Sequence, residues 1–299
     1  MKITLNKEIF LEKILLASKF ISNKLTSTSA LQGILFSSDK ENLYFNSSNL
    51  NCYFHSSLKI KTQEKFKIVV DPKKISEFVN LLPPGKIEIE VKEKQLLITA
   101  GKTKGSFGLI DFEDFPLAPK NPEKKQKIDK ALFEKRLPLV VFATSADESR
   151  PVLTGVNFIT DDNDLLMVAT DGFRLSLIKT KKNLEFPSLI IPAHILEEVI
   201  ALGKKEKEFY FSYSESEKII TFFLGENEIC SRLIEGDFPP FERVIPTEKK
   251  TTLILEKDDL LRNIKLASVF AKDFSNVIIF DISQEGLRIR PKIESKEEN

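Results

Sequence analysis

Six consecutive residues, Thr170 to Leu175 (TDGFRL), set an aromatic ring, a guanidinium group and a leucine side chain beside one another. The Asp-Gly pair predicts a tight turn or a bulge at the end of an apolar strand. An apolar patch with a polar rim is typical of a peptide docking surface. A plain hairpin end, with one core leucine and one surface arginine, explains the same residues. Composition alone favours the plain interpretation.

Residues for catalysis are few. The only histidines are His55 and His194, in a predicted strand and in the first turn of a predicted helix. Residues 101–103 (GKT) end like a phosphate-binding loop, but Leu96 stands where that motif needs glycine. Residues 161–164 (DDND) begin like a calcium loop without its central glycine and final glutamate. We therefore predict a non-catalytic protein with no metal and no cofactor.

Charge and cysteine content limit the kinds of partner and cellular setting that the sequence indicates. The 299 residues hold 45 Lys and Arg against 44 Asp and Glu, a net charge of +1, so no global basic field predicts nucleic-acid binding. Cys52 and Cys230 lie far apart without metal-ligand spacing, which favours a reducing, cytoplasmic setting. No apolar run is long enough for a membrane span or a signal-peptide core.

The elements that would position these residues occur as internal repeats. Leu16-Ala17-Ser18 recurs as Leu266-Ala267-Ser268 inside a longer shared pattern, and a middle copy begins near Lys127. The helix predicted after Asp71-Pro72 matches one after Ile191-Pro192. Phe36, Phe158 and Phe280 align in apolar strands. The period is about 122 residues, much longer than that of a solenoid.

Each repeat is predicted as a strand, a helix, about three strands, a second helix and about three more strands. This pattern is α+β, with two helices per domain packed on antiparallel sheets. Proline-rich, charged linkers at 116–125 and 239–250 predict three domains, at 1–121, 122–247 and 248–299. The third holds only a strand, a helix and a hairpin, so it is expected to be incomplete.

Three segments carry a resemblance to a known family: FATSADESRPVLTGV (142–156), VATDGFRLS (168–176) and EGDFPPFERVIP (235–246). Their order and spacing resemble the bacterial DNA polymerase III beta subunit family, the sliding clamps. The resemblance implies the DNA-clamp fold and a head-to-tail homodimeric ring around double-stranded DNA. It also implies a processivity factor without chemistry of its own, whose partners are the polymerase III alpha subunit, the clamp loader and repair polymerases.

The resemblance also implies a cleft that receives short peptides of these partners. Its positions in this sequence are Leu153, Thr170, Gly172, Phe173, Arg174, Leu175, Pro239, Arg243 and Val244. Phe173 replaces the histidine common in the family, so the cleft is expected to be more apolar and less sensitive to pH.

Contacts with DNA phosphates are expected first from Lys24 and Arg150, in loops where the family touches DNA. Further candidates on the repeat helices are Lys13, Lys19, Lys73, Lys74, Arg136, Arg262 and Lys265. For each of them a solvated helix face is the plainer interpretation. The resemblance places a dimer seam at Lys74, Phe107 and Leu109 of the first domain and near Phe270 of the third.

A full third repeat would extend well past Asn299, so ring closure is expected only if that domain is completed. Three hypotheses follow. The first is a processivity clamp that encircles duplex DNA, and the second is a ring-incompetent adaptor that binds client peptides without encircling DNA. The third, an enzyme acting on nucleotides or DNA, is disfavoured because no catalytic constellation is found.

Overall fold

The computed structural model describes residues 2–24, 28–62, 64–119, 123–161, 163–181, 186–273 and 275–292. The chain divides into two compact units, unit 1 (Met1–Phe238) and unit 2 (Pro239–Asn299). The predicted domain boundary at 121/122 and Asp162 of the calcium-like motif lie outside the described residues. In the described part of the chain, no helix is long and apolar enough to cross a membrane.

The first repeat contains two copies of one pattern, a strand followed by a helix and three strands. The first copy is β1 (Lys2–Asn6), α1 (Lys7–Ser18), β2 (Ile34–Ser38), β3 (Asn42–Ser48) and β4 (Cys52–Lys59), with the short 3-10 helix η1 (Ser29–Gln32) before β2. The second copy is β5 (Phe66–Val70), α2 (Pro72–Leu81), β6 (Lys86–Lys92), β7 (Gln95–Ala100) and β8 (Thr103–Ile110). Side chains cap both helices: Asn6 accepts from the Ile9 N–H, and Asp71 accepts from the Lys73 N–H.

The second repeat follows the same order. Its first half is β9 (Gln126–Lys127), η2 (Leu132–Arg136), α3 (Pro138–Val141), η3 (Pro151–Thr154), β10 (Gly155–Thr160), β11 (Asp164–Thr170) and β12 (Leu175–Lys181). Its second half is β13 (Leu189–Pro192), α4 (Ala193–Gly203), β14 (Tyr210–Ser214), β15 (Ile219–Leu224) and β16 (Asn227–Arg232). The helical segment of this middle copy begins after Asp129, whose carboxylate accepts from the Ala131 N–H. It includes a π-helical turn, η2, which ends two residues before Pro138. Proline has no N–H to continue the regular ladder, which explains the change.

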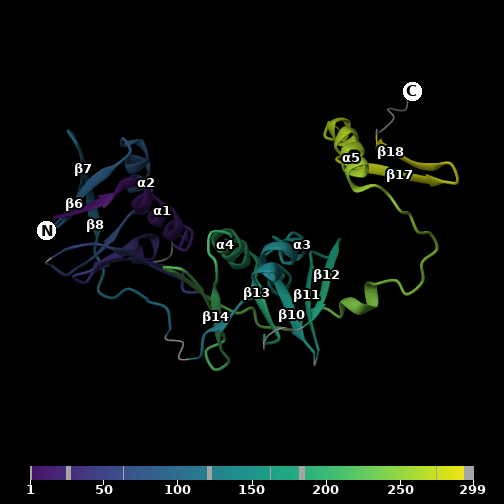
Figure 1. Cartoon of the computed structure of the whole chain (residues 1–299), viewed down its shortest axis with the longest axis horizontal. Helices are drawn as coiled ribbons and strands as arrows, with labels where there is room; N and C mark the ends of the chain where they lie inside the picture. The colour runs from purple at the N-terminus through teal and green to yellow at the C-terminus, as the bar shows by residue number, and fades with distance from the viewer. Residues whose placement is uncertain are drawn as a thin grey trace. The chain divides into compact units, whose positions relative to one another are not determined.

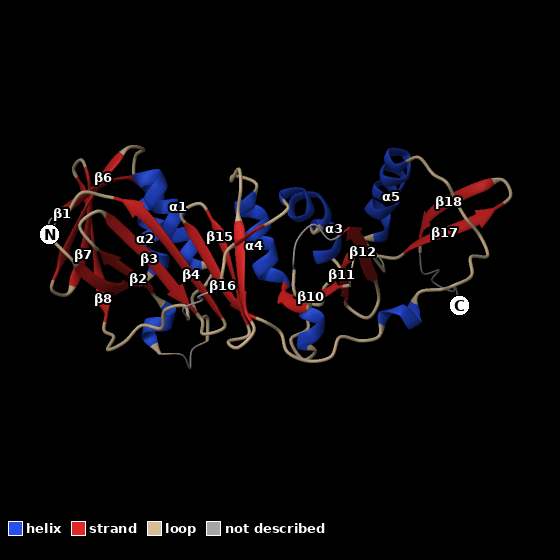
Figure 2. Ribbon diagram, turned by 60° about the horizontal axis from the view of Figure 1, so that its bottom comes forward, coloured by secondary structure: helices blue, strands red, loops and turns tan. Residues whose placement is uncertain are grey.

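The strands of unit 1 form an antiparallel sheet in the order β1-β6-β7-β8-β5-β2-β3-β4-β16-β15-β14-β9 and a smaller sheet in the order β12-β11-β10-β13. Within the first repeat the halves exchange their leading strands, because β1 pairs with β6 and β5 pairs with β2. The pairing of β4 with β16 joins the two repeats. Helices α1 and α2 pack together against these strands, as do α3 and α4 (Figures 1 and 2).

Phenylalanines dominate the core of unit 1. In the first repeat Phe36 meets Phe10 and Phe45 with ring centroids 5.8 and 5.1 Å apart, and all three side chains are buried. In the second repeat Phe133 lies edge-on to Phe209 at 5.6 Å. Each such ring buries a large apolar area between a helix and the sheet. The α+β architecture predicted from the sequence, with helices packed on antiparallel sheets, is confirmed.

Unit 2 contains η4 (Phe241–Val244), α5 (Lys257–Ala271), β17 (Ile278–Ser283) and β18 (Gly286–Pro291). Strands β17 and β18 form a two-stranded hairpin that packs against α5. The strand expected before the third-repeat helix, at 252–256, is not formed. Within the described residues this segment has no neighbouring strand to pair with, and a strand requires such a ladder.

Candidate functional site

The turn between β11 and β12 presents the candidate docking residues. Gly172 has φ +93°, a conformation that side chains rarely adopt. The Asp171 carboxylate accepts hydrogen bonds from the backbone N–H groups of Phe173 (2.9 Å) and Arg174 (3.0 Å), and these bonds lower the pKa of Asp171. The turn is thus held by its own hydrogen bonds, and it leaves the Phe173 side chain 97% exposed.

Two guanidinium groups border this turn. Arg174 Nε donates to Asp171 Oδ2 (2.9 Å), and the guanidinium carbon lies 5.3 Å from the centre of the Phe142 ring. Arg150 Nε pairs with Asp147 Oδ2 at 3.1 Å, and Nη1 of Arg150 lies 3.3 Å from where a Cβ on Gly172 would stand. The structure therefore brings Arg150, a DNA candidate in the sequence, to the edge of the docking turn.

The other docking candidates divide between the units. In unit 1, Thr170 Oγ1 donates to the Arg174 carbonyl (2.6 Å), Leu153 is buried in η3, and Leu175 is half-buried at the start of β12. The unit 2 candidates are all exposed, and they are Pro239, Arg243 and Val244. The structure thus places five of the nine predicted positions, Thr170, Gly172, Phe173, Arg174 and Leu175, at one turn. The docking role of all nine stays a prediction.

Sequence reasoning missed two contributors to this surface. Phe142, over half exposed, supports the Arg174 guanidinium, and Asp171 shapes the turn. Phe142 opens the first resembling segment, but nothing in the sequence predicts its approach to Arg174. The Asp-Gly pair did signal a tight turn, and an aspartate that bonds backbone N–H groups two and three residues later is typical of one.

Most DNA candidates are exposed, and several are engaged with acidic or polar side chains. Lys19 Nζ lies 2.7 Å from Glu198, Arg262 lies 2.6 Å from Asp259, and Arg136 bonds the Thr180 hydroxyl. Lys24, Lys73, Lys74 and Lys265 are also exposed. The unit 1 helices therefore carry basic groups interleaved with acidic ones, and their DNA-binding role stays a prediction.

Lys13 is placed differently from the other basic candidates. It is 7% exposed, and its ammonium group donates to Ser56 Oγ (2.7 Å) and Asn227 Oδ1 (3.1 Å) where α1 meets β4 and β16. Glu226 lies 3.6 Å away, and burial lowers the pKa of Lys13. An ammonium group with these partners joins the two repeats and is a poor phosphate contact, so Lys13 leaves the candidate DNA-facing set.

The predicted seam residues of the first domain lie on α2 and β8. Lys74 is exposed on α2, Phe107 and Leu109 are half-buried on β8, and Phe107 packs edge-on to Phe78. In the described part of unit 1, residues 103–108 of β8 pair with β7 alone, so this edge is open to another strand. Phe270, the predicted partner position, is 61% exposed on α5 of unit 2.

Groups suited to catalysis have structural partners. The His55 ring shares a 2.8 Å hydrogen bond with Asn46 Oδ1, and His194 Nε2 lies 3.5 Å from Cys52 Sγ. Burial lowers the pKa of both histidines and raises that of Cys52 to about 11, so this thiol is a weak nucleophile. Among the described residues, no group of three or more His, Cys, Asp or Glu side chains is placed to hold a metal ion.

Known proteins resemble this chain in sequence and in fold. The sequence matches the family descriptions "DNA polymerase III beta subunit, N-terminal domain" over residues 1–119 and "central domain" over residues 127–240. It is 29% identical to a beta sliding clamp of Treponema pallidum (strain Nichols), covering 99% of this chain and 81% of that protein. The crystal structure of the DNA polymerase sliding clamp from Bacillus subtilis aligns with a TM-score of 0.82 at 26% identity, covering 97% of this chain and 83% of that one. The beta subunit from DNA polymerase of Streptococcus pyogenes has the same fold, with a TM-score of 0.85 at 20% identity over 99% of this chain and 81% of that one.

Proposed function

Because the chain belongs to the beta sliding clamp family, the non-catalytic beta subunits of DNA polymerase III in DNA replication, we propose that it is a polymerase processivity factor. It encircles duplex DNA in the cytoplasm and holds the polymerase beside the primer end. A tether of this kind raises the effective concentration of the polymerase without any new chemistry. The match of two consecutive family domains over residues 1–240 carries this proposal.

The helices support the DNA-facing part of the proposal. Contacts with phosphates that must slide are weak and spread over many groups. Lys73 and Lys74 on α2 are exposed, and so is Lys19 at the C-cap of α1, where Glu198 partly neutralises its charge. Such a face attracts the phosphate backbone without fixing one register on it.

The Asp171–Arg174 turn supports the client-binding part. We assign it to short peptides of the polymerase III alpha subunit, the clamp loader and repair polymerases. The client-binding role of Pro239, Arg243 and Val244 in unit 2 stays a prediction. Phe173 offers an exposed ring to an aliphatic or aromatic anchor, and Arg174 and Arg150 offer donors to the peptide backbone or to acidic side chains. Ring closure would use Lys74, Phe107 and Leu109 against Phe270 of a second protomer, head to tail.

Retention on DNA tests encirclement directly. The full chain, loaded by a clamp loader onto nicked circular DNA, is expected to stay bound during gel filtration and to be lost once the circle is cut to a linear molecule. A topological link alone predicts this difference, because the contacts with phosphates are the same on both substrates. Equal retention on circular and linear DNA would refute encirclement.

Peptide affinity tests the docking turn. Phe173→Ala is expected to weaken binding of a polymerase-derived peptide by about tenfold, since an exposed aromatic anchor is typical of a binding hot spot. Leu81→Ala, at an exposed apolar position on α2, is the matched control and should leave the affinity unchanged. An equal loss in both variants, measured by fluorescence anisotropy, would remove the turn from the cleft.

One observation favours the adaptor as a second candidate function. In the described residues, the hydrogen bonds of Asp171 that hold the Asp171–Arg174 turn lie within the turn itself, so client peptides need no closed ring to find it formed. The adaptor predicts full peptide affinity with no difference between circular and linear DNA. A closed ring-shaped dimer, detected by light scattering and electron microscopy, would exclude it.

A further inference from the structure

Unit 2 exposes apolar side chains whose first-repeat equivalents are buried. Leu253 is 43% exposed where Ile3 is 2% exposed, and Leu255 is 44% exposed where Leu5 is 5% exposed. Phe280 on β17 is 46% exposed, whereas Phe36 at the matching position is 1% exposed. The exposed positions therefore belong to two features, the segment 252–256 and the strand β17.

The first repeat shows what normally covers these two features. Its halves exchange leading strands, so that β1 lies on β6 of the other half and β5 lies on β2. In this exchange Val70, directly before the α2 N-cap, pairs with Ile34, and Ile68 pairs with Phe36. Each half thus supplies a strand to its neighbour and accepts one in return.

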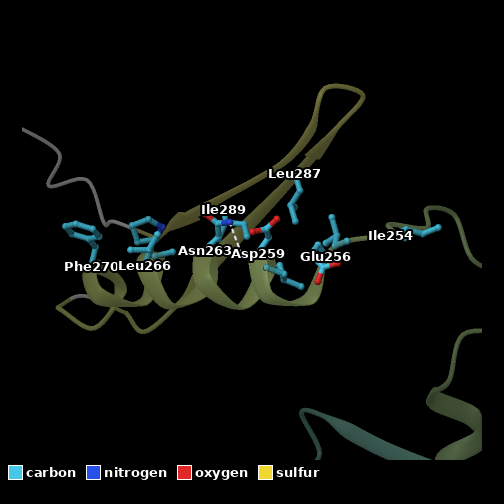
Figure 3. Close-up of a pocket in the computed structure, with 12 residues that line it drawn as sticks. Ile254, Glu256, Asp259, Asn263, Leu266, Phe270, Leu287 and Ile289 are labelled. Carbon is cyan, nitrogen blue, oxygen red and sulfur yellow. Dashed lines mark hydrogen bonds between the residues drawn. The ribbon is translucent and has the colours of Figure 1, made fainter.

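Unit 2 contains both parts of such an exchange, a leading segment that could be supplied and a strand edge that could accept one. Neither part is paired in the described residues. In its described residues β17 pairs with β18 alone, so its other edge is open, and the segment 252–256 has no strand partner. The groove of about 600 Å³ between α5 and the hairpin opens beside the same segment. Figure 3 shows Leu287 and Ile289 of the hairpin facing α5, with Ile254 on the segment that leads into the helix.

We propose that two copies of this chain pair through unit 2 by exchanging the segment 252–256, each laying it antiparallel on β17 of the other. The register follows from the first repeat. Leu255, directly before the N-cap of α5, lies opposite Ile278 of the second copy, and Leu253 lies opposite Phe280. A single two-fold axis satisfies both segments, since the surface that gives a strand also accepts one.

Charge at the helix ends fits the same arrangement. In the first repeat Lys7 Nζ donates to the Asn80 carbonyl (3.1 Å) at the end of α2, and Glu8 accepts from the Gly85 N–H (3.2 Å). Lys257 and Asp258 stand at the equivalent positions of α5 and are exposed. Across the two-fold axis they meet the end of the second α5, where Lys257 complements the carbonyl groups and Asp258 complements Lys272.

This pairing does not rest on the DNA-binding proposal. It uses β17 and the segment 252–256, whereas the head-to-tail seam uses Phe270 against β8. Circular-DNA retention and unit 2 pairing are measured separately, so failure of one leaves the other standing.

Disulfide cross-linking of the full chain tests the register. Leu253→Cys combined with Phe280→Cys should give a cross-linked dimer on a non-reducing gel after mild oxidation, because opposed strand residues bring their Cβ atoms within bridging range. Either substitution alone should give only monomer. In the proposed register neither residue 253 nor residue 280 lies opposite the same residue of the second chain. The native thiols Cys52 and Cys230 are buried and do not compete.

Sedimentation of disulfide-free variants gives the second readout. Leu253→Asp should weaken self-association at least tenfold. Ile254→Asp should not, because Ile254 occupies the outward-facing position of Thr4 although it is even more exposed in unit 2. A monomer at all concentrations would overturn the proposal, as would equal effects of the two substitutions. A cross-link from Phe107→Cys with Phe270→Cys, but none from the 253–280 pair, would assign the dimer to the head-to-tail seam instead.

Discussion

The half of the first repeat built on α1 and the half-repeat of unit 2 built on α5 have similar sequences but different environments. The apolar positions of α1 and β2 lie against α2 and the exchanged strand β5, whereas those of α5 and β17 meet no second half in the described residues. The helix and the hairpin form in both halves, but the leading strand forms only where a neighbour accepts it. Local pattern therefore suffices for a helix or a hairpin, and a leading strand depends on its partner.

Core truncation should give the largest difference between the halves. Phe36→Ala is expected to lower the free energy of unfolding of unit 1 by about 3–5 kcal/mol, because it empties a buried ring site between Phe10 and Phe45. Phe280→Ala, in dilute monomeric protein, should destabilise the α5 hairpin by less than about 1 kcal/mol because that ring is already in contact with water. Urea unfolding followed by tyrosine fluorescence isolates unit 1, which holds all four tyrosines, and hydrogen exchange follows α5.

Comparable costs at Phe36 and Phe280 would mean that the face of unit 2 is covered even at high dilution. The comparison between the two halves would then fail. A conservative control, Phe36→Leu, should recover most of the loss in unit 1 because it refills part of the site.

The polar contacts of the two helices should differ less. Lys13→Ala is expected to destabilise unit 1 by about 1–3 kcal/mol because Ser56 and Asn227 lose a buried donor. Asn263→Ala, at the equivalent exposed position of α5, should change the stability of unit 2 by less than about 0.5 kcal/mol. Equal losses of stability in Lys13→Ala and Asn263→Ala would contradict a structural role for the buried hydrogen bonds of Lys13.

The pH dependence sharpens the Lys13 prediction. Burial lowers the pKa of Lys13 in the folded state below the unfolded value of 10.5, so the unfolded chain binds more protons in the window between these two values. Stability contributed by Lys13 must therefore rise with pH through that window. Urea unfolding at a series of alkaline pH values should show the gap between wild type and Lys13→Ala widening toward pH 10.5, and a narrowing gap would reverse the sign of the argument.

Surface ion pairs should give the smallest difference. Lys19→Gln removes the pair with Glu198 that links α1 to α4, at an expected cost below about 1 kcal/mol that shrinks in high salt. Arg262→Gln removes a pair within α5 and should cost no more than about 0.5 kcal/mol. A large loss of stability in Lys19→Gln that does not depend on salt would show that the Lys19–Glu198 pair is not a surface ion pair.

Much of the fold could be predicted because each helix or strand of one repeat has an equivalent pattern in the next. The matched positions of Phe36 and Phe158 predicted equivalent strands, and both rings are buried in β2 and β10. Two local features could not be predicted from the pattern. Pro138 changes the helix after Asp129 into a π turn followed by a short helix, and the segment 252–256 lacks the partner that its pattern assumes.

The candidate site was predictable only where its chemistry is local. The Asp-Gly pair predicted the turn that exposes Phe173, since the hydrogen bonds of Asp171 reach only two and three residues along the chain. The contact of Phe142 with Arg174 joins separate elements, and the burial of Lys13 depends on Asn227 in the other repeat. Contacts between distant segments leave no periodic signal in a single sequence.

The ladder between β4 and β16 determines how unit 1 responds to force. Five residue pairs, from Asn227–Ser56 to Ser231–Cys52, continue the backbone hydrogen bonding of one repeat into the next. We therefore expect a bending load to pass across this junction as it passes between strands within either repeat. Lys13, which donates to Ser56 and Asn227, adds a side-chain link there. Unit 1 should flex as one curved plate when pulled at its ends, with strain spread over the sheet and no hinge between the two repeats.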